Sequence, residues 1–122
     1  MRGAKDYLLA IYTLQRDYKV ARVRDVADYL GLTKAAVTTT VKGLVRRGLV
    51  RHERYGYIEL TPYGESVAEP LYAATQKLAS IFRALGISSV TAERTAICIV
   101  VKASDSTLNQ FLTALEVFKK GG

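Results

Sequence analysis

The sequence predicts a mostly α-helical fold with one small β-hairpin, and three observations support this fold class. Apolar residues recur at helical spacing through most of the 122 residues, whereas strand-like alternation is confined to residues 49–60. Gly31 and Gly48 each follow a helical stretch where a left-handed cap is favoured. Hydrophobic residues make up 49% of the chain, enough for one compact domain, or for one domain with a short dimerisation extension.

The first three helices are expected between residue 5 and Gly48, where the third helix stops. Apolar spacing predicts one helix over 5–17 and a short second helix over 21–30. Thr33 stands at the N-cap of the third helix, whose core-facing residues are expected to be Val37, Val41, Leu44 and Val45. Two such helices joined by a tight turn that contains Gly31 form a helix-turn-helix pattern.

Residues 49–60 alternate as two short strands around a turn at Tyr55 and Gly56. A hairpin directly after the third helix is the wing of a winged helix-turn-helix domain. Its tip, Arg54 with Tyr55, is expected to reach the sugar-phosphate backbone or an adjacent minor groove. His52 is interpreted as a solvent-facing strand residue, because no residue of ligand type lies at a spacing that would complete a metal or catalytic site.

The remaining residues predict three further helices. Thr61 and Pro62 open a helix that can run to Leu85, with a kink or break at Pro70. Another helix spans about 91–103, where an apolar run leads us to expect Cys98 to be buried. A last helix begins at Ser104 or Asp105. The chain is thus divided into a winged domain, 1–62, and a helical dimerisation domain, 63–122.

The winged domain is too small to bury all the apolar residues of the C-terminal helices, so these helices are expected to pair in a homodimer. The residues predicted to form the dimer contact are Ile97, Val100, Val101, Leu108, Phe111, Leu112 and Leu115.

The net charge of +7 lies almost entirely in the first half of the chain. Residues 1–60 carry twelve Lys and Arg against six Asp and Glu, whereas residues 61–122 carry six against five. Between residues 34 and 54, six cations face the single acid Glu53. A one-sided basic block is typical of a phosphate-binding surface, although a solvated face that aids solubility has the same composition.

The outer face of the third helix combines small, hydroxyl and basic side chains: Lys34, Ala35, Thr38, Thr39 and Lys42. Such a face packs poorly in a core but can approach base edges closely, because Thr can bond to bases and its methyl can contact thymine. Arg46, Arg47 and Arg54 are expected to hold phosphates. The hypothesis is a regulator that binds a roughly palindromic duplex operator as a dimer.

The combined pattern resembles the metal-dependent repressors of the DtxR/MntR family. The likeness is carried by residues 6–12, by 23–32 leading into Val37 and Thr38, by 48–50 with Tyr55 and Gly56, and by 60–64. It implies that Ala35, Ala36, Thr38 and Thr39 lie against DNA and that Thr33 and Lys42 hold phosphates. It also implies the shorter, two-domain branch of that family.

The same resemblance implies a regulatory metal, but the ligand positions differ here. Ungapped counting places them at Asp6, Leu9, Thr75, Ile97, Val100 and Val101. If the alignment is shifted by one residue, Cys98 occupies the first ligand position of the last cluster, and Val101 and Lys102 occupy its other two ligand positions. Because aliphatic side chains cannot coordinate Mn²⁺ or Fe²⁺, we expect no metal, no cofactor and no metal switch.

Two other function classes are weighed against DNA binding. A winged-helix protein-interaction module of the transcription machinery is the alternative, and salt-insensitive binding to protein with no duplex binding would favour it. We do not expect an enzyme, because one His, one Cys and no glycine-rich phosphate loop do not assemble a catalytic site. The single cysteine and the lack of a signal peptide or membrane span favour the cytoplasm, with no membrane partner.

Overall fold

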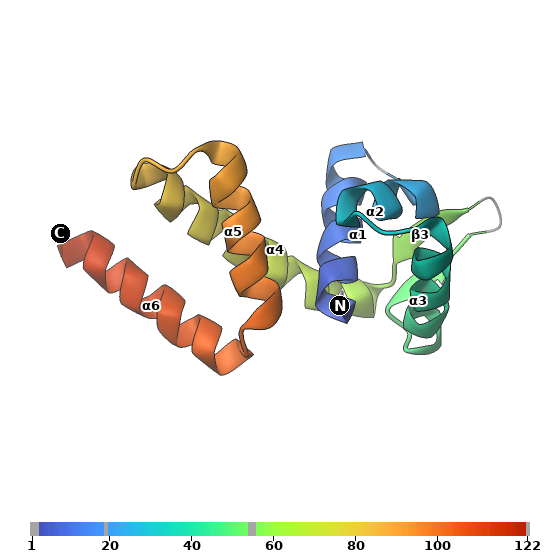
Figure 1. Cartoon of the computed structure of the whole chain (residues 1–122). Coiled ribbons are helices and arrows are strands. Elements are labelled where there is room, and N and C mark those ends of the chain that lie inside the picture. Colours follow the sequence, from blue (N-terminus) through green and yellow to red (C-terminus); the bar gives the residue numbers. More distant parts are fainter. Residues whose placement is uncertain (1–2, 19, 54–55, 122) are drawn as a thin grey trace. The chain divides into compact units, whose positions relative to one another are not determined.

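The computed structural model describes residues 3–18, 20–53 and 56–121 and divides the chain into two compact units, Met1–Tyr72 and Ala73–Gly122. The first unit contains α1 (Ala4–Tyr18), β1 (Ala21–Arg22), α2 (Val23–Leu30), α3 (Lys34–Arg46), β2 (Val50–His52) and β3 (Tyr57–Leu60). α4 (Pro62–Ala84) begins in the first unit and continues into the second, which also holds α5 (Ser89–Lys102) and α6 (Asp105–Gly121) (Figure 1). The predicted fold class, mostly helical with a small β wing, is confirmed.

The sheet has one strand more than the predicted hairpin. Its order is β1-β3-β2, with both pairs antiparallel. Ala21 and Arg22 were expected in the second helix, but they pair with Ile58 and Tyr57 of β3. The helix therefore begins at Val23, and its Asp25 side chain accepts a hydrogen bond from the Arg22 N–H at 3.1 Å, which fixes the helix start.

One hydrophobic core holds the first unit together. Side chains of α1, α2, α3 and the sheet meet there, and Tyr7, Ile11, Val26, Val37 and Ile58 are each at most 2% exposed. Burial of these apolar surfaces is the main stabilising contribution, about 25 cal/mol per Å². The core fixes which face of α3 is left outside.

The turns around α3 form as predicted. Gly31 adopts a left-handed conformation with φ of 69°, and the Thr33 hydroxyl accepts a hydrogen bond from the Ala36 N–H at 3.1 Å. Val45, however, was expected in the core and is 41% exposed. It lies about 100° around the helix from the buried Leu44, which turns it away from the packed stripe.

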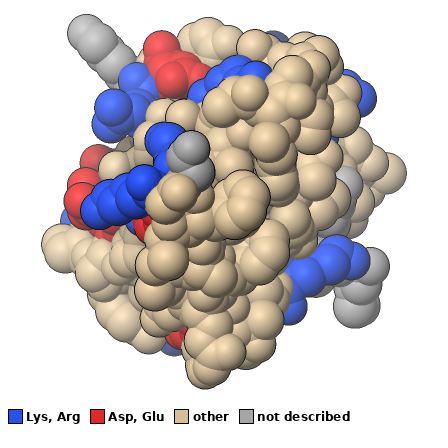
Figure 2. Space-filling model, turned by 90° about the vertical axis from the view of Figure 1, so that its left-hand side faces the viewer, with Lys and Arg blue, Asp and Glu red and all other residues tan. Residues whose placement is uncertain are grey.

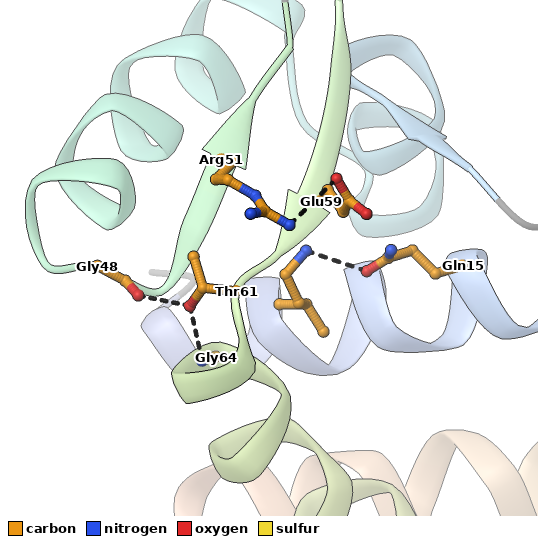
Figure 3. Close-up of polar contacts among 7 residues, drawn as sticks. Gln15, Gly48, Arg51, Glu59, Thr61 and Gly64 are labelled. Carbon is orange, nitrogen blue, oxygen red and sulfur yellow. Dashed lines mark hydrogen bonds and ion pairs between the residues drawn. The ribbon is translucent and has the colours of Figure 1, made fainter.

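Thr61 joins the start of α4 to the turn that follows α3. Its hydroxyl donates to the Gly48 carbonyl at 2.5 Å and accepts from the Gly64 N–H at 3.0 Å (Figure 3). The Thr61 N–H also donates to the Leu49 carbonyl at 3.1 Å. These bonds hold the first turn of α4 against the backbone between α3 and β2.

The chain after the sheet is helical. α4 continues through Pro70, which lies in the first unit, so the predicted break is absent and a kink there stays a prediction. The carbonyl of Ser66 lacks its helical donor, but both residues are exposed and water can replace the bond. Cys98 is exposed, so its predicted burial is wrong. α5 buries Ala92, Ala96 and Val100, and Cys98 lies off that stripe.

No helix in the described parts of the chain combines the length and the apolar character needed to cross a membrane.

Candidate nucleic-acid interface

The outer face of α3 is the centre of the candidate interface. The helix sequence, KAAVTTTVKGLVR, contains no acidic residue. Val37, Val41 and Leu44 form the buried stripe of α3. The other faces of the helix lie outside this stripe. Most of the residues predicted to contact DNA from this segment are exposed, and Thr38 is half-buried: Thr33, Lys34, Ala35, Ala36, Thr38, Thr39, Lys42, Arg46 and Arg47.

The hydroxyl groups of this face have defined partners. Thr33 accepts from the Ala36 N–H, which leaves its own O–H free to donate outward. The Thr39 hydroxyl donates to the Ala35 carbonyl at 3.1 Å, so its oxygen can still accept a hydrogen bond. Together with the small side chains of Ala35 and Ala36, these groups allow close approach of another polar surface.

The cations of α3 are available for an external anion. Among the described residues, the ion pairs are Arg24 with Asp25, Arg51 with Glu59, and Lys77 with Glu116. None of these pairs includes Lys34, Lys42, Arg46 or Arg47. A patch of exposed, uncompensated cations attracts a polyanion over several ångströms and makes that attraction dependent on salt.

The wing presents fewer free charges than the sequence suggested. Arg51 lies opposite Glu59 in the sheet register, and its guanidinium is 3.5 Å from the carboxylate (Figure 3). Arg51 is therefore partly compensated. His52 is exposed, as predicted. The predicted wing-tip contacts Arg54 and Tyr55 lie outside the described residues.

Contacts distant in sequence hold the wing to the rest of the unit. The Gln15 side-chain oxygen of α1 accepts from the Leu60 N–H of β3 at 3.2 Å (Figure 3). At the other end of β3, the Arg22 guanidinium donates to the Tyr57 hydroxyl at 3.0 Å and lies 5.0 Å from the ring centroid. This hydrogen bond raises the pKa of Arg22 above its ordinary value.

Sequence reasoning did not single out Arg22, Tyr57 or Gln15. Arg22 and Tyr57 are 35 residues apart, and only the pairing of β1 with β3 brings them together. The available signal was Arg22 directly before the apolar stripe of α2, and this was interpreted as part of the helix.

The fold of the first unit and the outward basic face of α3 define a winged helix-turn-helix protein. Residues 1–63 match the family model described as "Iron dependent repressor, N-terminal DNA binding domain". The chain therefore belongs to the iron-dependent repressor family, which confirms the predicted resemblance to DtxR/MntR proteins.

Curated relatives support this assignment, and solved structures share the fold. The chain is 31% identical over 83 residues to the HTH-type transcriptional regulator MntR of Lysinibacillus sphaericus, and 31% identical over 84 residues to that of Geobacillus kaustophilus. These matches cover 68% and 69% of this chain but 60% of each relative. The crystal structure of T. acidophilum IdeR superposes with a TM-score of 0.77 at 18% identity, over 95% of this chain and 55% of that chain. The structure of the manganese regulator SloR superposes with a TM-score of 0.67 at 26% identity, over 93% of this chain and 55% of that chain.

The residues at the metal-ligand positions implied by the family do not fit a divalent cation. Leu9 and Val100 are aliphatic and buried, and Ile97 and Val101 are half-buried. At the N-terminus of α1, the Asp6 carboxylate accepts from the Gly3 N–H at 3.0 Å. Across residues 3–18, 20–53 and 56–121, no three His, Cys, Asp or Glu side chains gather where a metal could bind. Asp6 is the one carboxylate among these positions and none of them is a histidine, so they offer too few of the oxygen and imidazole ligands that Mn²⁺ and Fe²⁺ require.

Proposed function

We propose that this chain binds duplex DNA through α3 and regulates transcription as a repressor, by occupying an operator in the cytoplasm. The observation that carries the proposal is the face of α3: exposed cations and small hydroxyl residues without one acid, on a helix whose opposite stripe is locked into the core. The role is binding and not catalysis. Membership of a family whose N-terminal domain is described as DNA-binding supports the same conclusion.

We assign base contacts and phosphate contacts to different residues according to their side-chain chemistry. Ala35, Ala36, Thr38 and Thr39 approach the base edges in the major groove, where hydroxyl and methyl groups distinguish base pairs. The phosphates are held by cations and hydroxyls placed around that face, namely Thr33, Lys34, Lys42, Arg46 and Arg47, with Arg54 and Tyr55 at the wing tip. Phosphate contacts supply affinity and register, and base contacts supply sequence preference.

Replacing Arg47 by Ala should weaken binding to all duplexes alike and lower the salt slope of log K by about one unit, because one phosphate contact is lost. Titrations at several salt concentrations measure the slope. Arg83→Ala, an exposed arginine in the last turn of α4, is the control with the same change in charge and should leave the slope unchanged. An unaltered slope for Arg47→Ala would remove that residue from the interface.

The second unit supports the proposal of a homodimer, with a surface revised from the sequence prediction. Val100 and Leu108 are 0% and 7% exposed, so they pack within the chain and have little surface to offer a partner. Ile97, Val101, Leu112 and Leu115 are half-buried. Large apolar side chains that are exposed in this unit are Leu85, Ile87, Val90, Phe111, Val117 and Phe118. On the face viewed in Figure 2, a broad area carries no charged side chain.

Phe111 and Phe118 lie two turns apart on α6 and are 41% and 78% exposed. Replacing both by Lys should convert a dimer into a monomer, because two charges would have to be buried in an apolar contact. Sedimentation velocity measures the mass. Asn109→Lys with Thr113→Lys adds the same charge on the opposite side of α6 and should remain dimeric. A wild-type chain that sediments as a monomer would contradict the proposed assembly.

We further propose that DNA binding does not depend on a metal at the family site. Affinity for the operator should be the same with added Mn²⁺ and with a chelator, because aliphatic residues occupy the ligand positions. Titration of one duplex under both conditions measures this. An increase in affinity of about tenfold with Mn²⁺, which corresponds to about 1.4 kcal/mol, would show that other residues bind the metal.

A further inference from the structure

Thr39 lies where little else on the outer face of α3 covers it. Residues three and four positions away are the neighbours of a side chain on a helix. For Thr39 these neighbours are Ala35, Ala36, Lys42 and Gly43. Two methyl groups and a glycine hide little, the lysine is long and flexible, and Thr39 is exposed. A flat polar edge, such as that of a base, can therefore come within hydrogen-bond distance of the Thr39 hydroxyl.

A hydrogen bond within α3 determines how the Thr39 hydroxyl can bond to anything outside the chain. The hydroxyl lies 3.1 Å from the Ala35 carbonyl, and a carbonyl oxygen can only accept, so the hydroxyl must be the donor. A threonine hydroxyl has one proton and two lone pairs. Because the proton is already donated, an external group meets an oxygen that can only accept.

The Thr33 hydroxyl has the opposite polarity. Its oxygen accepts from the Ala36 N–H at 3.1 Å, so its proton remains available to an external acceptor. A donor at the start of α3 suits a phosphate oxygen, which accepts hydrogen bonds. Two residues of the same type thus differ in what they can bind, because each hydroxyl makes a different bond within the chain.

Base edges in the major groove differ in the same way. The exocyclic amino groups of adenine (N6) and cytosine (N4) donate, whereas guanine O6 and N7 and thymine O4 accept. An acceptor that faces an amino group gains a hydrogen bond. An acceptor that faces a keto oxygen brings two oxygens together without a proton between them, after both have lost their water. The polarity of the Thr39 hydroxyl should therefore distinguish bases by their exocyclic group.

We propose that Thr39 selects a base with an exocyclic amino group, adenine or cytosine, at one position of the DNA site and disfavours guanine and thymine there. This inference rests on the proposed DNA binding through α3, and it adds the chemical class of base that one residue recognises. It gives Thr39 no phosphate. Removal of its hydroxyl should therefore change the sequence preference and leave the salt dependence of binding as it is.

The test starts from a duplex selected from a random pool, in which each position is then replaced by the other three bases. The wild-type chain should bind adenine or cytosine at one position about tenfold more tightly than guanine or thymine. Thr39→Val keeps the shape but loses the oxygen, so this preference should disappear at an unchanged salt slope. Thr39→Ser keeps the oxygen and can bond to the same carbonyl, so the preference should remain.

Thr13→Val is the matched control on the protein. The Thr13 hydroxyl donates to the Leu9 carbonyl at 2.8 Å, which is the same bond in α1, and its loss should leave every base preference unchanged. If Thr39→Val unfolds, which circular dichroism would show, Thr39→Ala replaces it, since alanine is the best helix former.

Base analogues supply the matched control on the DNA. 2-Aminopurine in place of adenine, or pyrimidin-2-one in place of cytosine, removes the amino group from the major groove. At the selected position either analogue should weaken binding of the wild type by about tenfold. The same analogue should make no difference to the relative affinity of Thr39→Val, which has no acceptor to lose.

Three results would overturn the inference. The first is a Thr39→Val variant that keeps every base preference of the wild type. The second is a variant that loses a preference for guanine or thymine, because the hydroxyl would then donate to DNA. The third is a wild-type chain that binds all duplexes equally, which would leave the proposed phosphate contacts intact. A wild-type chain that binds no duplex at all would instead refute the proposed function itself.

Discussion

Replacing Ala35 by Glu should weaken binding to the operator by about 100-fold or more, because a carboxylate on the outer face of α3 opposes DNA phosphates and carbonyl edges. Ala35 is exposed in the first turn of α3. A glutamate there interacts favourably with the helix dipole, so the fold should be retained. Affinity titration and thermal unfolding of the same sample separate the two effects.

The matched control is Gln76→Glu, which makes the same change in net charge at an exposed position of α4. Its affinity should stay close to that of the wild-type chain, apart from a small effect of net charge that salt screens. Equal affinities for Ala35→Glu and the wild type would place the DNA-binding surface away from α3.

Gly64→Ala should destabilise the chain by about 2 to 4 kcal/mol, the largest effect on stability that we expect from one added methyl group. A Cβ at Gly64 would overlap the carbonyl of Leu49. That carbonyl cannot move aside freely, because it accepts the Thr61 N–H at 3.1 Å. Urea unfolding monitored by circular dichroism measures the change.

Gly43→Ala is the control for this substitution. Gly43 lies inside α3, where the nearest atom to an added Cβ would be the Arg46 side chain at 3.9 Å. There alanine should stabilise the helix by about 0.5 to 1 kcal/mol. A Gly64→Ala variant as stable as the wild type would show that the turn after α3 can shift to accommodate the added methyl group.

Local signals in the sequence predicted most of the fold. The helix starts at Thr33, Thr61 and Ser104 follow from side chains that cap the backbone nearby, and each forms its capping bond in the structure. Helical periodicity likewise separated the buried stripe of α3 from its outer face. These features depend on residues within one or two turns, which a sequence pattern records directly.

Features that depend on distant partners were not predicted. β1 has two residues, too few for any alternation, and it exists because β3 offers a free edge. The ring contact and hydrogen bond between Arg22 and Tyr57 depend on that pairing. Cys98 looked buried within an apolar run, but which side of α5 is covered is decided by its neighbours in the second unit and not by the run itself.

Selection of bound fragments from a random duplex pool at physiological salt tests the central claim, that the outer face of α3 reads DNA as part of a two-fold dimer. The account predicts enrichment of a roughly palindromic motif whose half-sites are about 10 base pairs apart, the spacing of successive major grooves on one side of the duplex. A pool that shows no enriched motif, or equal retention of all sequences, would contradict it.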